Sequence, residues 1–334
     1  MLKCFKSPDY NFVFNVETGF FARWGKTKDD DPEFSPFGPE IMDIEISTIC
    51  SRGCQWCYKS NEYKGKNMSF ETFKAIFDTF PKHLTQIAFG IGDIDGNPDL
   101  WKIMSYCREN GVIPNITING ERMTTELYNR LADVCGAVAV SLYDKDTCYN
   151  AIKELTDRGV QTNIHTLLSK ETYTNCYEVL FDRTTDARLK DLNALVFLWL
   201  KPKGERNSFN QVNIKALKNL VDTAFKVGVK FGFDSCTAPM FLKVVKDRPD
   251  FENYKTMAES CESCLFSGYI NTEGLYFPCS FADGVGEWAN GISVLAYKDF
   301  NEVWQHPQVK KYRENSISTL DCNGCRKCLI YDLG

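Results

Sequence analysis

Apolar and polar residues alternate along the first half of the chain with two different periods. Within residues 41–47 the apolar side chains fall on one face and the acidic Asp43 and Glu45 on the other, a period of two that is typical of a strand. Apolar side chains between Phe73 and Phe80 then recur at helical spacing, and Ser69 is placed to cap that helix. A strand followed by a helix is therefore the first predicted unit.

The same alternation continues to residue 236. It predicts further strands at 86–89, 112–118, 137–142, 160–167, 194–200 and 230–233, and further helices at 98–109, 123–134, 145–157, 172–183 and 211–226. Because helices separate the strands, we expect parallel pairing through right-handed crossovers. Several strands are almost wholly apolar, as when both faces are covered. The pattern predicts an α/β fold with a partial or full barrel over 41–236 and its chemistry at the carboxyl ends of the strands.

Two shorter regions flank the predicted barrel. Residues 1–40 read as a β-rich lead-in that ends in a loop rich in Pro and Asp. Residues 237–334 are rich in Cys and contain a predicted hairpin, in which a Thr-Glu-Gly turn joins 269–271 to 275–277. A helix is expected around 304–312. We therefore expect three parts: the lead-in, the barrel and a small Cys-rich α+β domain.

Composition narrows the function classes. The net charge is −5 and there is no block of Lys or Arg, which makes nucleic acid an improbable partner. No apolar run approaches about 18 residues, and the N-terminus lacks the apolar core of a signal peptide. Fifteen cysteines in such a chain indicate metal binding in a reducing, cytoplasmic location and not disulfides.

Three of these cysteines form a compact motif after the first predicted strand. Cys50, Cys54 and Cys57 have the spacing C-x3-C-x2-C, with Trp56 just before the last cysteine. Three thiolates on one loop can hold three irons of a [4Fe–4S] cluster and leave the fourth iron open. Zinc is the alternative, although it usually takes four ligands as two separated pairs.

The motif resembles the signature of the radical S-adenosylmethionine (SAM) superfamily, and the resemblance covers about residues 41–236. It implies a partial six-strand barrel and an open iron that binds the amino and carboxylate groups of SAM. It also implies that an electron from the cluster cleaves SAM to a 5′-deoxyadenosyl radical.

The resemblance also implies SAM contacts at the strand tips. Where the family often has Gly-Gly-Glu-Pro, residues 90–94 read Gly-Ile-Gly-Asp-Ile, so Asp93 is the candidate for the amino group of SAM. Asn119 and Ser141 end the next two strands and are candidates for its ribose and methionine parts, and Trp56 lies beside the adenine in the family pattern. The alternatives are a turn-stabilising Asp, a tight Asn-Gly turn and a packing Trp.

Three further residues are candidates on the expected active face. Lys201 opens a basic tip that could pair with the SAM carboxylate or with an acidic substrate group, or could be a solvated loop. Cys236 shares strand parity with Asp234 if the last strand continues. It is then a possible hydrogen-atom donor, as in some radical SAM epimerases, or an auxiliary ligand, against the alternative of a small buried apolar residue. His165 is more often a satisfied polar residue than a catalyst.

A second group of cysteines lies near the C-terminus. Its members are Cys261, Cys264, Cys279, Cys322, Cys325 and Cys328. The spacing C-x9-G-x4-C, with Gly274 as the glycine, resembles the opening of the SPASM and twitch extensions of radical SAM enzymes. Six cysteines are too few for two fully Cys-ligated cubanes, so one auxiliary [4Fe–4S] cluster is expected, held by the first three and at least one of the last three. Two incompletely ligated clusters, or zinc, remain alternatives.

Together these features predict a radical SAM enzyme. Peptide or protein modification is the first expectation, by thioether formation, epimerisation, oxidation or crosslinking, with electrons from a flavodoxin or ferredoxin type of donor. Dehydrogenation or rearrangement of an alcohol, sugar or nucleotide is the alternative, and the basic tip would suit an anionic small substrate. A metal-stabilised binding protein without catalysis is the third reading.

Overall fold

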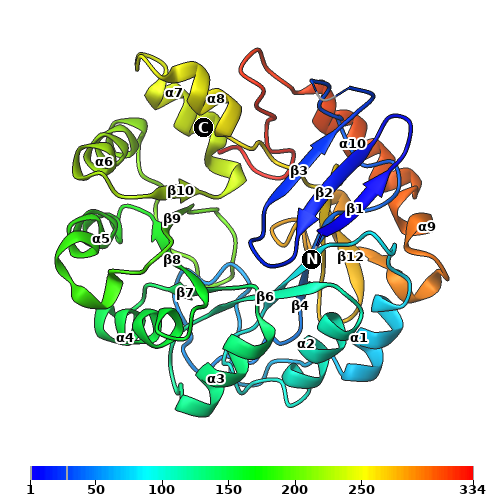
Figure 1. The fold of residues 1–334 in the computed structure, drawn as a ribbon, viewed down its shortest axis with the longest axis horizontal. Helices are drawn as coiled ribbons and strands as arrows, with labels where there is room; N and C mark the ends of the chain where they lie inside the picture. The colour runs from blue at the N-terminus through cyan, green and yellow to red at the C-terminus, as the bar shows by residue number, and fades with distance from the viewer. Residues whose placement is uncertain (1, 28, 334) are drawn as a thin grey trace.

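Parallel strands form the centre of the fold in the computed structural model, which describes residues 2–27 and 29–333 (Figure 1). They are β4 (Ile41–Glu45), β5 (Gln86–Gly90), β6 (Ile113–Ile118), β7 (Ala137–Ser141), β8 (Gln161–Leu168), β9 (Ala194–Trp199) and β10 (Phe231–Phe233). Each pairs in parallel with the next along the chain, so that their order in the sheet follows the sequence. The predicted α/β class is therefore confirmed, and β10 leaves the curved sheet open at one edge.

Helices connect these strands and cover the outer face of the curved sheet (Figure 1). They are α1 (Phe70–Phe77), α2 (Leu100–Glu109), α3 (Thr125–Val134), α4 (Lys145–Thr156), α5 (Tyr173–Thr185) and α6 (Ile214–Val227). The predicted cap is present, because the side chain of Ser69 accepts a hydrogen bond from the backbone N–H of Thr72. No helix among the described residues is long and apolar enough to cross a bilayer.

The C-terminal hairpin continues the same sheet. Strand β11 (Ser267–Ile270) pairs in parallel with β4, and β12 (Leu275–Phe277) and β13 (Ile292–Ser293) follow in antiparallel order. The hairpin itself was predicted from its turn, and Gly274 adopts the positive φ of +77° that the turn requires. Its pairing with β4 places the Cys-rich segment beside the strand that leads into Cys50.

The lead-in forms a separate three-stranded antiparallel sheet of β1 (Leu2–Lys6), β2 (Asn11–Asn15) and β3 (Phe21–Trp24). Its aromatic side chains pack with Leu265 and Phe266 of the C-terminal segment. Residues 16–19, at the turn of this sheet, line a cavity with Gln86, Asn115 and Gln161 near the amino ends of the parallel strands.

Two local expectations differ from the structure. The last parallel strand ends at Phe233 and a 3-10 turn follows over Ser235–Thr237, so strand parity does not place Asp234 and Cys236. The helix expected around 304–312 is divided into α9 (Phe300–Trp304) and α10 (Pro307–Ser318), because Pro307 starts a new helix. Helices α7 (Ala238–Val245) and α8 (Phe251–Met257) precede the Cys-rich segment.

The inner face of the curved sheet is open to solvent. Along β4, Met42 and Ile44 point outward and are fully buried under the helices, whereas Asp43 between them is exposed. The same alternation recurs in β8, where Ile164 and Thr166 are buried and His165 is only half-buried. In a filled barrel, layers of bulky side chains occupy this space. Here small and polar side chains leave it accessible.

Arg23 joins the N-terminal sheet to the rest of the molecule. Its guanidinium donates to Glu40 at 2.8 Å and to Glu262 at 2.8 Å, and lies 3.4 Å from the ring centroid of Phe266. Burial raises the pKa of the Glu40 carboxyl to about 7, against the opposing effect of Arg23. Because folding raises this pKa, stability falls as the pH rises towards 7, and Arg23 limits the loss.

Replacing Arg23 with Met is expected to destabilise the protein by about 3 kcal/mol near pH 8, since it leaves buried carboxylates without their cation. The loss should be smaller near pH 5.5, where Glu40 of the variant keeps its proton. Thermal unfolding midpoints at both pH values measure the effect. Arg130→Met is the control, because Arg130 is exposed and its contacts, an ion pair with Glu126 and the face of the Trp101 ring, leave no buried carboxylate behind. Equal shifts in the two variants would contradict the account.

Candidate functional site

The loop after β4 carries the first cysteine motif and is held by its own backbone. The N–H of Cys50 donates to the carbonyl of Glu62 at 3.0 Å, and the N–H of Cys57 donates to that of Cys54 at 3.2 Å. All three thiols are half-buried. Burial raises the pKa of the Cys50 thiol, and the backbone N–H groups of Arg52 and Gly53 oppose this by pointing at its sulfur.

These residues fit an iron–sulfur cluster. Three thiols on one short loop form an all-sulfur donor set, and N–H groups aimed at the sulfur stabilise the thiolate form that a cluster needs. Burial also raises the pKa of the Cys54 thiol, while the guanidinium of Arg52 lowers it. No three Cys, His, Asp or Glu side chains among residues 2–27 and 29–333 converge to hold a single metal ion.

The loop after β5 packs directly on the cysteine loop. A Cβ added to Gly92 would lie 2.1 Å from the carbonyl oxygen of Ile49 and 2.6 Å from the Cβ of Cys50, so only glycine fits. Next to it, the N–H of Asp93 donates to the carbonyl of Ile49 at 2.9 Å. The carboxylate of Asp93 in turn accepts from the N–H of Ser51 at 2.8 Å.

Asp93 is buried and also meets the loops that follow β6. Asn119 donates its amide to one carboxylate oxygen of Asp93 at 3.2 Å and to the carbonyl of Gly92 at 3.3 Å. Arg122 forms an ion pair with the other oxygen. Protein donors therefore occupy most of the acceptor positions of this carboxylate. The structure brings Asp93, Asn119 and the cysteine loop together, whereas their roles towards SAM stay predictions.

Trp56 and Ser141 lie on the next part of the same edge. The Trp56 ring packs 4.9 Å from Phe209 and 5.9 Å from Tyr143, measured between ring centroids. Ser141 ends β7 on the inner face and is half-buried. Tyr143 lies under the guanidinium of Arg52 at 4.4 Å, so this edge contacts the cysteine loop.

The basic tip after β9 makes contacts within the protein. Lys201 is buried with its side chain 2% exposed, and its ammonium pairs with Asp234. Lys203 donates to the carbonyls of Ser280 at 3.0 Å, Phe281 at 3.3 Å and Asp283 at 2.7 Å, the segment just after Cys279. Burial lowers the pKa of Lys203 to about 8. The cations at 201 and 203 are thus both engaged.

The basic tip, residues 201–206, also contacts the loop that carries the first cysteine motif. Gly204 has φ +105°, and a Cβ there would lie 2.2 Å from the carbonyl oxygen of Cys57. The N–H of Glu205 donates to the hydroxyl of Ser60 at 2.8 Å, and Arg206 donates to the carbonyl of Asn61 at 2.7 Å. The tip therefore joins the loop of the first cysteine motif to the segment that follows Cys279.

Replacing Lys203 with Met is expected to loosen the segment 279–283, because three carbonyls lose a charged donor. We expect its amide hydrogens to exchange roughly tenfold faster or more. Hydrogen–deuterium exchange with mass spectrometry on the reconstituted protein measures this. Lys215→Met, at an exposed position on α6, is the control. Unchanged exchange at 279–283 would contradict the assigned role of Lys203.

A buried ion-pair network makes a second connection between the two cysteine regions. Lys59 donates to the hydroxyl of Tyr269 at 2.7 Å and to Asp283 at 2.6 Å, and lies 3.3 Å from Glu45. The Tyr269 hydroxyl donates to Glu45 at 3.0 Å. Burial raises the pKa of Glu45, and Lys59 opposes that shift. Sequence reasoning missed this network, although a Lys two residues after the last cysteine of the motif was visible.

The pKa values of three later cysteines, Cys261, Cys264 and Cys279, are raised by neighbouring cysteines. Burial raises the pKa of the thiols of Cys261 and Cys279. Cys328 raises both pKa values further, and Cys261 also raises that of Cys279. Cys264 is buried and has a φ of +61°. Burial raises the pKa of its thiol, and Cys261 and Cys279 raise it further. Its sulfur lies 3.2 Å from the hydroxyl of Tyr276. Among the three tail cysteines, Cys328 is thus the one whose charge affects the pKa values of Cys261 and Cys279.

The other two tail cysteines differ. Cys322 is exposed. Cys325 is buried, and the charged neighbours that shift its pKa are Asp321 and Arg326.

Cys236 lies within electrostatic reach of this second group, and His165 shares with Cys236 the charged neighbour Asp234. Burial raises the pKa of Cys236, with smaller contributions from Asp234, Cys261 and Cys279, and Lys201 opposes the shift. Burial lowers the pKa of His165 to about 4, and Asp234 is its charged neighbour. The inner face of the sheet therefore connects the last strands to the second cysteine group.

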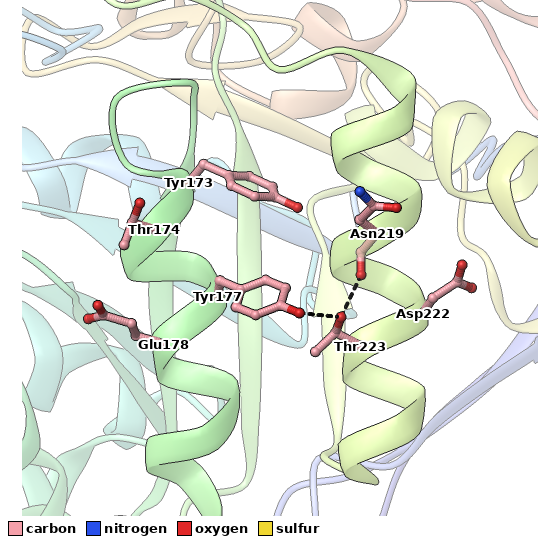
Figure 2. Close-up of a pocket in the computed structure, with 7 residues that line it drawn as sticks. All are labelled: Tyr173, Thr174, Tyr177, Glu178, Asn219, Asp222 and Thr223. Atoms are coloured by element: carbon pink, nitrogen blue, oxygen red, sulfur yellow. Dashed lines mark hydrogen bonds between the residues drawn. The ribbon is translucent and has the colours of Figure 1, made fainter.

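A groove between α5 and α6 lies away from this site, on the outer layer of helices (Figure 2). Tyr173 and Tyr177 face α6 across it, and Thr223 Oγ1 donates to the Tyr177 hydroxyl oxygen at 3.1 Å. It contains none of the residues predicted for the site.

Comparison with known proteins places the site in a family. Residues 44–144 match the model of the radical SAM superfamily. The chain resembles the crystal structure of Streptococcus suis SuiB bound to precursor peptide SuiA, with 13% identity, a TM-score of 0.71 and coverage of 98% of this chain and 95% of SuiB. It also resembles native anSMEcpe with bound AdoMet and Cp18Cys peptide, with 16% identity, a TM-score of 0.59 and 82% coverage of both chains. No curated protein matches.

These findings confirm the predicted resemblance and the fold. Residues 44–144 form a radical SAM domain, and the parallel sheet as a whole has the partial barrel architecture of solved radical SAM proteins.

Proposed function

We propose that this chain is a radical SAM enzyme that modifies a peptide or protein. The observation that carries the proposal is the cysteine loop at 50–57, which lies at the carboxyl end of β4 within a radical SAM domain and beside an open inner face. Such an arrangement lets a reactive group formed at the loop meet a substrate inside the curved sheet.

Cys50, Cys54 and Cys57 would hold a [4Fe–4S] cluster. With SAM bound, that cluster supplies one-electron cleavage of SAM to a 5′-deoxyadenosyl radical, after reduction by a flavodoxin or ferredoxin type of donor. The protein positions the cluster, SAM and the substrate, and it excludes water from the reaction. Asp93 fixes the cysteine loop against the β6 tip through Ser51 and Asn119.

SAM would lie over this edge of the sheet. The open acceptor position of Asp93, the amide of Asn119 and the hydroxyl of Ser141 are its proposed polar contacts, and Trp56 borders the adenine. These groups belong to three neighbouring strand ends, so one molecule can reach all of them.

We assign one auxiliary [4Fe–4S] cluster to Cys261, Cys264, Cys279 and Cys328. The pKa values of Cys261, Cys264 and Cys279 are each raised by at least one other cysteine of the set, which supports it, and an all-thiol set of four suits a cubane. The contacts of Lys203 and Lys59 would fix its position relative to the first cluster.

Peptide modification is favoured over small-molecule chemistry for two reasons. The solved structures of SuiB and anSMEcpe that resemble this chain contain peptides. The basic tip, which had suggested an anionic small substrate, is occupied within the protein at Lys201 and Lys203.

The test is to express the chain with short peptides encoded next to its gene and to analyse them by mass spectrometry. Thioether formation, crosslinking or oxidation removes two hydrogens, and epimerisation in deuterated water adds one deuterium at the reacting carbon. Peptides unchanged in both experiments, while the purified protein consumes SAM with a small alcohol or sugar, would favour the small-molecule alternative.

A further inference from the structure

Asp43 is a carboxylate on the inner face of the sheet, and it has no partner in the described part of the chain. It lies in the middle of β4, between Met42 and Ile44, which point the other way and are fully buried. No side-chain hydrogen bond or ion pair within residues 2–27 and 29–333 engages its carboxylate. Solvent reaches the side chain, yet the surrounding protein raises its pKa to about 6. Because Asp43 lies in mid-strand on the inner face of the curved sheet, with strands paired on both sides of β4, solvent reaches it from inside the sheet and not from an outer surface.

The other charged groups of this wall are already paired. Lys59 pairs with both Glu45 and Asp283, Lys201 pairs with Asp234, and Lys203 donates to backbone carbonyls. His165, on the strand β8 of the same inner face, is neutral near pH 7 because burial lowers its pKa to about 4. Among the described residues, Lys59, Lys201 and Lys203 are therefore all engaged by groups other than Asp43.

Aromatic rings flank the same position. Tyr269 is the direct neighbour of Asp43 on β11 and shares its face of the sheet. The Tyr58 side chain lies close enough to Asp43 and Glu45 for both carboxylates to raise its pKa, and its ring packs 4.4 Å from that of Phe281. Lys59 already lies 4.8 Å from the centroid of the Tyr269 ring, so the attraction that this position offers to an organic cation comes from the charge of the Asp43 carboxylate.

The position of Asp43 separates it from the SAM edge. It precedes Glu45 by two residues, which in a strand is about 7 Å further from the end that carries the cysteine loop. A group that reaches Asp43 therefore enters the hollow below the loop, where a substrate would lie.

We propose that Asp43 binds a positively charged group of the substrate, so that the peptide presents a Lys or Arg side chain inside the curved sheet. This rests on the proposed peptide-modifying function and adds a substrate class to it. Asp43 is a specificity-determining residue in this account.

The test measures binding and needs no turnover. The reconstituted protein with SAM is titrated, up to millimolar concentration, with four blocked pentapeptides that differ only in a central Lys, Arg, norleucine or Glu. The wild type should bind the Lys and Arg peptides roughly tenfold more tightly than the norleucine peptide. Asp43→Asn should remove this preference, and Asp43→Lys should favour the Glu peptide. Asp133→Asn, an exposed carboxylate on α3, is the matched control and should keep the wild-type preference.

Two outcomes overturn the proposal: no preference for cationic peptides in the wild type, or the same preference in Asp43→Asn. A loss of SAM affinity in Asp43→Asn with an unchanged peptide preference would instead assign Asp43 to SAM. Iron content and circular dichroism of Asp43→Asn check that it folds. Formation of 5′-deoxyadenosine is measured separately, so failure of the radical function is distinguishable from failure of this inference.

Discussion

A variant with Cys50, Cys54 and Cys57 all replaced by Ala is expected to lose about four irons per chain. It should form no detectable 5′-deoxyadenosine from SAM. The reason is that these three thiols share one loop, held by its own backbone hydrogen bonds, and are the proposed protein ligands of the first cluster. The iron that remains should be about four, bound by the C-terminal cysteines. Iron analysis and Mössbauer spectroscopy after anaerobic reconstitution measure both numbers.

The matched control replaces cysteines outside both groups. Cys4 is exposed, and Cys148 is buried under the sheet, so Cys4→Ala and Cys148→Ala should keep the full iron content. A triple variant that keeps all its iron would contradict the assignment of the first cluster. A triple variant that loses all of it would contradict the auxiliary cluster.

Gly92→Ala should disable the same site without touching a cysteine. The added Cβ would overlap the carbonyl of Ile49 and the Cβ of Cys50. A backbone carbonyl and a Cβ atom cannot rotate out of the way as the end of a long side chain can. The cysteine loop must therefore shift. A displacement of about 1 Å can cost about a hundredfold in rate, so we expect at least that loss in 5′-deoxyadenosine formation, with lower iron retention.

Gly232→Ala is the control for this substitution. Gly232 lies in β10, has no atom within 4 Å of an added Cβ and does not require a positive φ. It should keep its iron and its SAM cleavage. If Gly92→Ala matched Gly232→Ala in both measurements, the close packing of the β5 loop on the cysteine loop would not govern the site.

Local patterns in the sequence were sufficient for the order of strands and helices. Apolar periodicity marks β4 to β10 because outward side chains are buried by helices, and Ser69 marks the start of α1 because a cap is a local interaction. The place of the cysteine loop followed from its position after β4. These features depend on residues close together in the chain.

Contacts between segments that are distant in the chain could not be predicted from the sequence. The parallel pairing of β11 with β4 joins Tyr269 to Asp43 across more than two hundred residues. Lys203 donates to the carbonyls after Cys279, although in the sequence it belongs to a segment that could equally be a solvent-exposed loop. Such contacts depend on the register and curvature of the whole sheet, which periodicity does not record.

The end of the last parallel strand shows the same limit on a smaller scale. A continued strand would place Asp234 and Cys236 on one side, but the chain turns after Phe233 because Asp234 pairs with Lys201 and accepts from Thr237. A tertiary ion pair decided the local conformation there.

The most direct test of the central claim is anaerobic. The protein is reconstituted with iron and sulfide, its iron is counted, and dithionite and SAM are added before 5′-deoxyadenosine is measured by liquid chromatography and mass spectrometry. The account predicts about eight irons per chain and 5′-deoxyadenosine that depends on both dithionite and SAM. A fully loaded protein that forms none would contradict it.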